Sequence, residues 1–93
     1  MSYEHFINKS DYVCYYNDMT LYSKPAQIQA RCAEITFYNK GTTTMIVNGI
    51  SFLPGIGIAF DGREGELDVT KYLLTFTGAG QNAAFVIQKM YTK

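Results

Sequence analysis

The chain has 93 residues, a length that supports one domain with a single core. Eight Lys and Arg residues balance eight Asp and Glu residues, so zero net charge argues against nucleic acid or an anionic membrane as the partner. Apolar residues make up 47% of the chain, which excludes intrinsic disorder, and charged residues only 17%, which indicates a surface that a partner covers.

We expect no targeting signal at the N-terminus. The chain starts without a basic segment or an apolar run of signal-peptide length. The longest nearly apolar stretch, 50–60, is shorter than the roughly 20 residues that span a bilayer. We expect a protein made in the cytoplasm, with residues 1–11 as an extended N-terminal arm.

Strand-forming residues dominate 12–16 and 19–22, and Asn17-Asp18 stands between the two runs. Asn and Asp are common turn residues because their side chains hydrogen-bond to nearby backbone. The pattern therefore predicts a β-hairpin over 12–22.

The next segment alternates and then changes its phase. Ile28, Ala30 and Cys32 are even-numbered, whereas the following apolar residues, Ile35 and Phe37, are odd-numbered. One extra residue in a strand would cause this change, so we expect a strand with a β-bulge or break near Ala33. A helix over 26–34 is the alternative.

Turn signals divide the middle of the chain into short strands. Residues 39–41 form a turn, and a strand over 42–47 ends at Asn48-Gly49, a pair that accepts positive φ at both positions of a hairpin turn. Residues 50–53 should pair back on 45–47, and Pro54-Gly55 suits a type II turn. In the next strand, 56–60, small residues on one face leave room for a neighbouring backbone or ring.

Two more strands, 72–77 and 83–91, follow the polar loops 61–66 and 78–82. The chain thus has about eight short antiparallel strands and no long amphipathic helix. We predict an all-β fold over 1–93, a small β-sandwich of the jelly-roll or immunoglobulin-like type.

Residues with catalytic or metal-binding chemistry are sparse. Cys14 and Cys32 are expected to be free and buried inside strands, and His5 has no ligand partners at suitable spacing. The acidic residues of 61–68 do not match a calcium-binding loop, so we interpret them as a solvated loop. We therefore expect no enzyme activity, no cofactor and no metal.

Tyrosine is unusually frequent, with eight residues and no tryptophan. Tyrosine is enriched at protein interfaces because it offers a large rigid face and a polar hydroxyl. The alternative is its ordinary preference for strands. The candidate interface residues are the five near the N-terminus: Tyr3, Tyr12, Tyr15, Tyr16 and Tyr22.

Four segments over about 34–77 resemble short β-rich structural proteins of tailed or icosahedral bacteriophages. They are Asn39-Lys40-Gly41-Thr42-Thr43, Val47-Asn48-Gly49-Ile50, Leu53-Pro54-Gly55, and 61–72 with its alternating Glu66, Asp68, Thr70 and Tyr72. The resemblance implies a non-catalytic virion subunit, such as a capsid decoration or vertex protein or a tail or spike adaptor. Its partners would be other capsid or tail proteins, including copies of itself.

A binding module for carbohydrate or peptide is the alternative function. Outward-facing tyrosines can stack on sugar rings, although the absence of tryptophan counts against this interpretation.

Overall fold

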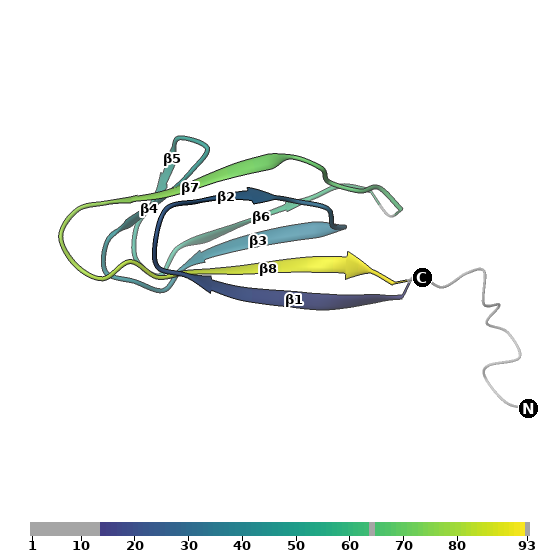
Figure 1. Cartoon of the computed structure of the whole chain (residues 1–93), viewed down its shortest axis with the longest axis horizontal. Coiled ribbons are helices and arrows are strands. Elements are labelled where there is room, and N and C mark those ends of the chain that lie inside the picture. The colour runs from purple at the N-terminus through teal and green to yellow at the C-terminus, as the bar shows by residue number, and fades with distance from the viewer. Residues whose placement is uncertain (1–13, 64, 93) are drawn as a thin grey trace, which may run out of the picture.

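The computed structural model describes residues 14–63 and 65–92 (Figure 1). This part of the chain consists of strands and loops, and it contains no helix that could cross a membrane. The strands are β1 (Tyr15–Tyr22), β2 (Ala26–Gln29), β3 (Glu34–Asn39), β4 (Thr44–Val47), β5 (Ile50–Phe52), β6 (Gly57–Asp61), β7 (Lys71–Thr77) and β8 (Ala84–Tyr91).

The strands form two four-stranded antiparallel sheets, ordered β1-β8-β3-β6 and β2-β7-β4-β5 (Figure 1). The first four strands pair with the last four in nested order: β4 with β5, β3 with β6, β2 with β7, and β1 with β8. The pairs β3–β8 and β4–β7 complete the two sheets. The predicted all-β fold with eight strands in two sheets is confirmed.

The core lies between the sheets, and both contribute to it. Its buried side chains are Ile28, Ala30, Cys32, Ile35, Phe37, Met45, Val47, Phe52, Tyr72, Leu74, Ala84 and Val86. An aromatic cluster links the sheets, because the Tyr72 ring of β7 lies 5.2 Å from Phe37 of β3 and 5.1 Å from Phe60 of β6, between ring centroids. Such tilted aromatic pairs add to the free energy gained from burial.

The change of phase near Ala33 marks the point where the chain leaves one sheet for the other. Glu34 is paired with Lys89, and the preceding Ala33 N–H also donates to Lys89 O at 2.7 Å. One residue earlier, Cys32 is bridged to Asp68, which precedes β7 of the other sheet, so the strand is broken at Ala33. The predicted break near Ala33 is confirmed, although 28–37 is two strands in different sheets and not one. The alternative of a helix over 26–34 is wrong.

The predicted turns of the middle segment are also present. Asn48 and Gly49 have φ of 48° and 84°, and β5 pairs back on β4 with Val47 opposite Ile50. Gly55 has a φ of 82°, as a type II turn requires. Gly57 lies opposite Tyr38, and a Cβ on Gly57 would lie 3.1 Å from the Tyr38 ring, so the small residue does leave room for an aromatic side chain.

The predicted hairpin over 12–22 is wrong. Asn17 and Asp18 lie in the middle of β1, paired with Lys89 and Gln88 of β8. Both side chains are exposed, so their place in a strand does not remove them from water. Every residue of β1 also has a partner residue on β8, so the chain continues as one strand through Asn17 and Asp18. Residues 12–13 and the proposed arm, 1–11, lie outside the described residues.

Candidate interaction surface

Strand β1 lies at the edge of its sheet (Figure 1). Within residues 14–63 and 65–92, no strand lies beyond it, and every residue from Tyr15 to Leu21 is exposed. Natural edge strands are usually kept from pairing by Lys, Pro, bulges or short length. Strand β1 is eight residues long and contains neither Lys nor Pro, and Asp18 is its single carboxylate.

The backbone of β1 offers hydrogen-bonding groups at this free edge. Thr92 N–H donates to Cys14 O at 2.9 Å, so the peptide groups of Cys14 face β8. Because these groups alternate in direction along an antiparallel strand, the even-numbered residues of β1 also face β8. The N–H and C=O groups of Tyr15, Asn17, Met19 and Leu21 therefore point to the free edge.

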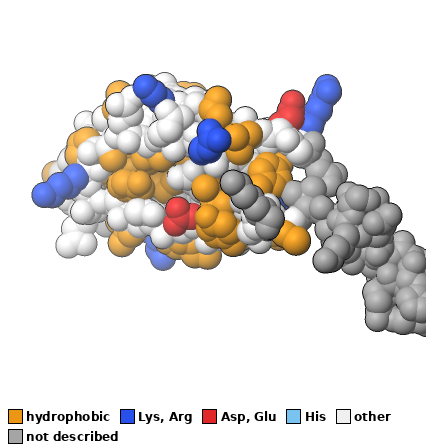
Figure 2. All heavy atoms as spheres, turned by 45° about the vertical axis from the view of Figure 1, so that its right-hand side comes forward, with side chains coloured by type: hydrophobic (Ala, Val, Ile, Leu, Met, Phe, Trp, Pro, Cys, Tyr) orange, Lys and Arg blue, Asp and Glu red, His pale blue; other side chains and the backbone are white. Residues whose placement is uncertain are grey.

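An exposed apolar patch adjoins the same edge, on the side of the sheet that faces away from the core. Met19 is 56% and Leu21 61% exposed, and they are paired with Ile87 and Phe85 of β8. Phe85 is in turn paired with Tyr38 of β3. We call these five residues the outer apolar patch. In Figure 2, hydrophobic side chains gather between scattered charged ones on the visible face.

Strand β8 is apolar on both faces over 84–87. Ala84 and Val86 are buried in the core, whereas Phe85 and Ile87 are half-buried on the outer side. An antiparallel sheet with one solvated face normally alternates apolar and polar residues. Apolar residues on the outer face of β8 are what a contact with another molecule would require, in addition to the contact with the core on the inner face.

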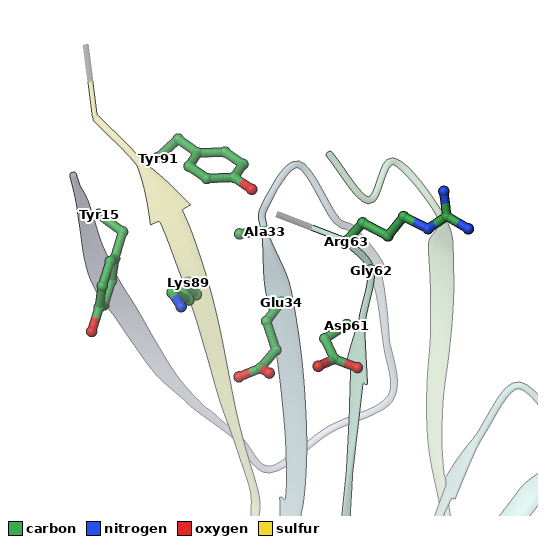
Figure 3. Close-up of a pocket in the computed structure, with 8 residues that line it drawn as sticks. All are labelled: Tyr15, Ala33, Glu34, Asp61, Gly62, Arg63, Lys89 and Tyr91. Carbon is green, nitrogen blue, oxygen red and sulfur yellow. The ribbon is translucent and has the colours of Figure 1, made fainter. Parts of the chain in front are cut away.

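A hollow of about 350 Å³ lies beside this patch, where the sheet meets the loop after β6 (Figure 3). Its lining residues are Tyr15, Ala33, Glu34, Asp61, Gly62, Arg63, Lys89 and Tyr91. Lys89 Nζ lies 4.3 Å from the centroid of the Tyr15 ring, a cation–π contact. Glu34 is paired with Lys89 on one side and with Asp61 on the other, whereas Arg63 points away from the other side chains (Figure 3).

The loop beside the hollow is held in place by Tyr91. The Tyr91 hydroxyl accepts from Gly65 N at 3.0 Å and donates to Glu66 O at 3.1 Å. Glu66 Oε1 accepts from Arg63 N at 2.6 Å. The hollow thus combines two aromatic side chains with carboxylates and a lysine, a chemistry that suits a polar ligand with an apolar face.

Of the five predicted interface tyrosines, the three that the structure describes do not form one cluster. Tyr15 and Tyr16 are each 53% exposed, but they lie on opposite faces of β1, and only Tyr15 lines the hollow. Tyr22 is half-buried and packs against the core. Tyr3 and Tyr12 lie outside the described residues.

Sequence reasoning missed the outer apolar patch and Tyr91. The apolar run Ala84-Phe85-Val86-Ile87 was the available signal, because it departs from the alternation of a half-solvated strand. These residues lie beside Met19 and Leu21 because β1 pairs with β8. The expected hairpin over 12–22 gave β1 a different partner, so the sequence did not predict these contacts.

Both cysteines are free, as expected, but only Cys32 is buried and Cys14 is exposed. Burial, together with the nearby Asp68 carboxylate, raises the pKa of the Cys32 thiol, which disfavours the nucleophilic thiolate. His5 lies outside the described residues. Among the described residues, no group of three or more His, Cys, Asp or Glu side chains could hold a metal ion.

Asp68, the last residue of the acidic segment 61–68, is hydrogen-bonded to residues at the start of β7. Asp68 accepts hydrogen bonds from Tyr72 Oη at 2.6 Å and from Thr70 N at 2.8 Å. Partial burial alone would raise the pKa of Asp68, but the hydrogen bonds from Tyr72 and Thr70 outweigh this effect and lower it. Burial and the hydrogen bond to Asp68 raise the pKa of Tyr72 to about 12. These groups stabilise the end of β7.

No protein-family model matches the chain, and no curated protein sequence matches it.

Proposed function

We propose that this protein is a non-catalytic structural subunit that works by binding neighbouring protein subunits. The observation that carries the proposal is the exposed edge strand β1, which has eight residues and lies beside the outer apolar patch. Backbone groups at such an edge supply affinity by strand pairing, and adjacent apolar side chains supply specificity. Neutral net charge and low charge density fit a surface that packs against protein.

We infer further that the domain is a jelly roll and a component of a virus particle. The nested pairing of β1–β8, β2–β7, β3–β6 and β4–β5 supports this inference, because a jelly roll arises when a long antiparallel pair of chain halves rolls into two sheets. Jelly rolls are common in viral capsid proteins and in lectins. The resemblance of 34–77 to bacteriophage structural proteins favours a decoration, vertex, or tail or spike adaptor role.

A double variant at the edge tests the interaction function. Met19→Lys with Leu21→Lys places two charges on the outer side of β1 and should abolish incorporation into purified virus particles, measured by quantitative mass spectrometry. Leu73→Lys is the matched control, because Leu73 is 53% exposed on a strand of the other sheet. Far-ultraviolet circular dichroism would establish that all three proteins fold.

The wild-type chain and the Leu73→Lys control are expected in the particle at the abundance of a repeated subunit. A wild-type chain that is absent from particles would contradict the virion role. Equal incorporation of the edge variant would contradict the role of β1.

Carbohydrate binding is a second candidate, favoured by the hollow. Tyr15 and Tyr91 offer rings beside Glu34, Asp61 and Lys89, and a volume of about 350 Å³ is within the range of small-ligand sites. The test is a glycan array followed by calorimetric titration of any hit. Tyr15→Ala should remove the binding, whereas Tyr16→Ala, equally exposed on the opposite face of β1, should preserve it. An array without hits would contradict this function.

A further inference from the structure

We propose that the occupant of the β1 edge is β1 of a second copy of this chain, paired antiparallel about a two-fold axis at Met19. The proposal rests on the interaction function proposed above and deepens it by naming the partner. Pairing two such edges would join two four-stranded sheets into one continuous sheet with no free β1 edge.

The backbone restricts how two copies of β1 can pair. Tyr15, Asn17, Met19 and Leu21 present their N–H and C=O groups to the free edge. In an antiparallel pair, each of these N–H groups must meet a C=O of the residue opposite, and each C=O must meet its N–H. An odd-numbered residue therefore has to lie opposite an odd-numbered residue. In a symmetric pair, the axis passes through a single residue of β1.

Two of the allowed registers keep most of β1 paired. One places the axis at Asp18, with 15–21 pairing with itself, and the other places it at Met19, with 16–22 pairing with itself. Axes at Asn17 or Thr20 shorten the overlap, because one end of each strand then passes beyond the partner strand.

Charge decides between the two long registers. An axis at Asp18 sets two carboxylates directly opposite in a non-hydrogen-bonded pair, where the Cα atoms are about 4.5 Å apart, and like charges so placed are destabilising. An axis at Met19 sets Asp18 opposite Thr20, whose hydroxyl can donate to the carboxylate. The two Asp18 side chains then become diagonal neighbours, about 7–8 Å apart.

The Met19 register also covers the exposed side chains of β1 on both faces. On the outer side, Met19 meets Met19 of the second copy, with Leu21 diagonal to it, so the two outer apolar patches become continuous. On the other side, Tyr16 lies opposite Tyr22. Tyr16 is 53% and Met19 56% exposed in the single chain, so the pairing buries apolar surface that is now in water.

Disulfide trapping tests both the partner and the register. In a Cys14→Ser background, which removes the exposed native thiol, Met19→Cys should form a covalent dimer under mild oxidation. Cα atoms of a hydrogen-bonded pair are about 5.5 Å apart, within the range that a disulfide spans. Asp18 is kept in the remaining variants, because its charge decides the register. A mixture of the Asn17→Cys and Leu21→Cys proteins should form the mixed dimer, since these residues lie opposite each other when the axis is at Met19. A mixture of the Tyr15→Cys and Leu21→Cys proteins, which lie opposite each other when the axis is at Asp18, should not. Leu73→Cys gives the level of random collision.

Each outcome is decisive. Trapping at Met19 and between positions 17 and 21, well above the Leu73→Cys level, supports the proposal. Preferential trapping between positions 15 and 21 overturns the register. Trapping at no position above the Leu73→Cys level overturns self-pairing. In that case, loss of the Met19→Lys, Leu21→Lys chain from particles would still support the interaction function with a different partner, so the two proposals fail separately.

Discussion

Asn39 shows how one polar side chain joins the connections at one end of the sandwich. It is fully buried, and its amide donates to Thr43 O at 2.8 Å and to Phe52 O at 3.0 Å. Its side-chain oxygen accepts from Gly41 N at 3.0 Å. All of its hydrogen-bonding groups are thus used, which is the condition under which a buried amide stabilises a fold.

Asn39→Ala should lower the free energy of unfolding by about 3 kcal/mol, because it leaves two carbonyls and one N–H without this partner. Urea denaturation measures the change, and Asn17→Ala, at an exposed position, is the control. A loss below about 1 kcal/mol would mean that water replaces the amide at little cost. The sequence marked Asn39 only as a turn residue, since one of its partners, Phe52 O, lies on β5, 13 positions further along the chain.

Asp68 should make the fold sensitive to acid. Its pKa is lower in the folded chain than in the unfolded chain, so its stabilising effect is complete above the ordinary Asp pKa of about 4 and is lost as the pH falls through the folded value. Asp68→Asn should lower stability at neutral pH by about 1 kcal/mol, a modest figure because the carboxylate is partly exposed. Urea denaturation from neutral to acidic pH should show a shallower acid loss for the variant. Parallel curves would contradict this role.

Tyr72 should make the fold sensitive to alkali. Its pKa is raised to about 12, so the phenol stabilises the fold fully below the ordinary Tyr pKa of about 10, and the effect is lost as the pH rises through the folded value. Tyr72→Phe keeps the ring beside Phe37 and Phe60 but has no proton to lose. We expect wild-type stability to fall between about pH 10 and 12 and that of the variant to fall less. Absorbance of the phenolate gives an independent measure of the titration.

At the scale of elements, local turn chemistry located most strand boundaries but failed at β1. Asn48-Gly49 and Pro54-Gly55 end strands because Asn48, Gly49 and Gly55 have positive φ, which these residue types allow. Asn17-Asp18 has the same local preference but lies inside a strand, because every residue of β1 pairs with a residue of β8. Those partners lie about seventy positions away in the sequence, so no local pattern identifies them.

Gly57 should be the least replaceable residue of β6. A Cβ at this position would lie 2.6 Å from Phe37 O and 3.1 Å from the Tyr38 ring, so the neighbouring strand would have to shift. Gly57→Ala should therefore lower the free energy of unfolding by about 1–3 kcal/mol, the usual cost of overpacking. Thermal and urea denaturation would measure it, with Ala59→Ser on the same strand as control. An unchanged or higher stability would mean that the β3–β6 pair adjusts freely.

For the whole molecule, the sequence predicted the all-β fold and two packed sheets, because alternation and turns recur at short intervals. It did not predict which strands lie at the edges, since that depends on long-range pairing. The interface prediction was based on tyrosine content near the N-terminus, without knowledge of which strands lie side by side. Tyr15 lies in the hollow and Tyr22 against the core, whereas the outer apolar patch is made of Met, Leu, Ile, Phe and Tyr residues from three strands.

The β1 pairing has a consequence for the stability of the entire chain. A protein that unfolds from a dimer to two separate chains has a melting temperature that rises with protein concentration, because mass action favours the dimer. Differential scanning calorimetry of the wild type should show a rise of about 5 °C over a hundredfold range of concentration, given the enthalpy typical of a domain of this size. Met19→Lys with Leu21→Lys should melt at one temperature throughout that range, and Leu73→Lys should behave as the wild type does. A wild-type melting temperature independent of concentration would show that β1 has no second copy against it, and the exposed edge would then have to meet a different protein.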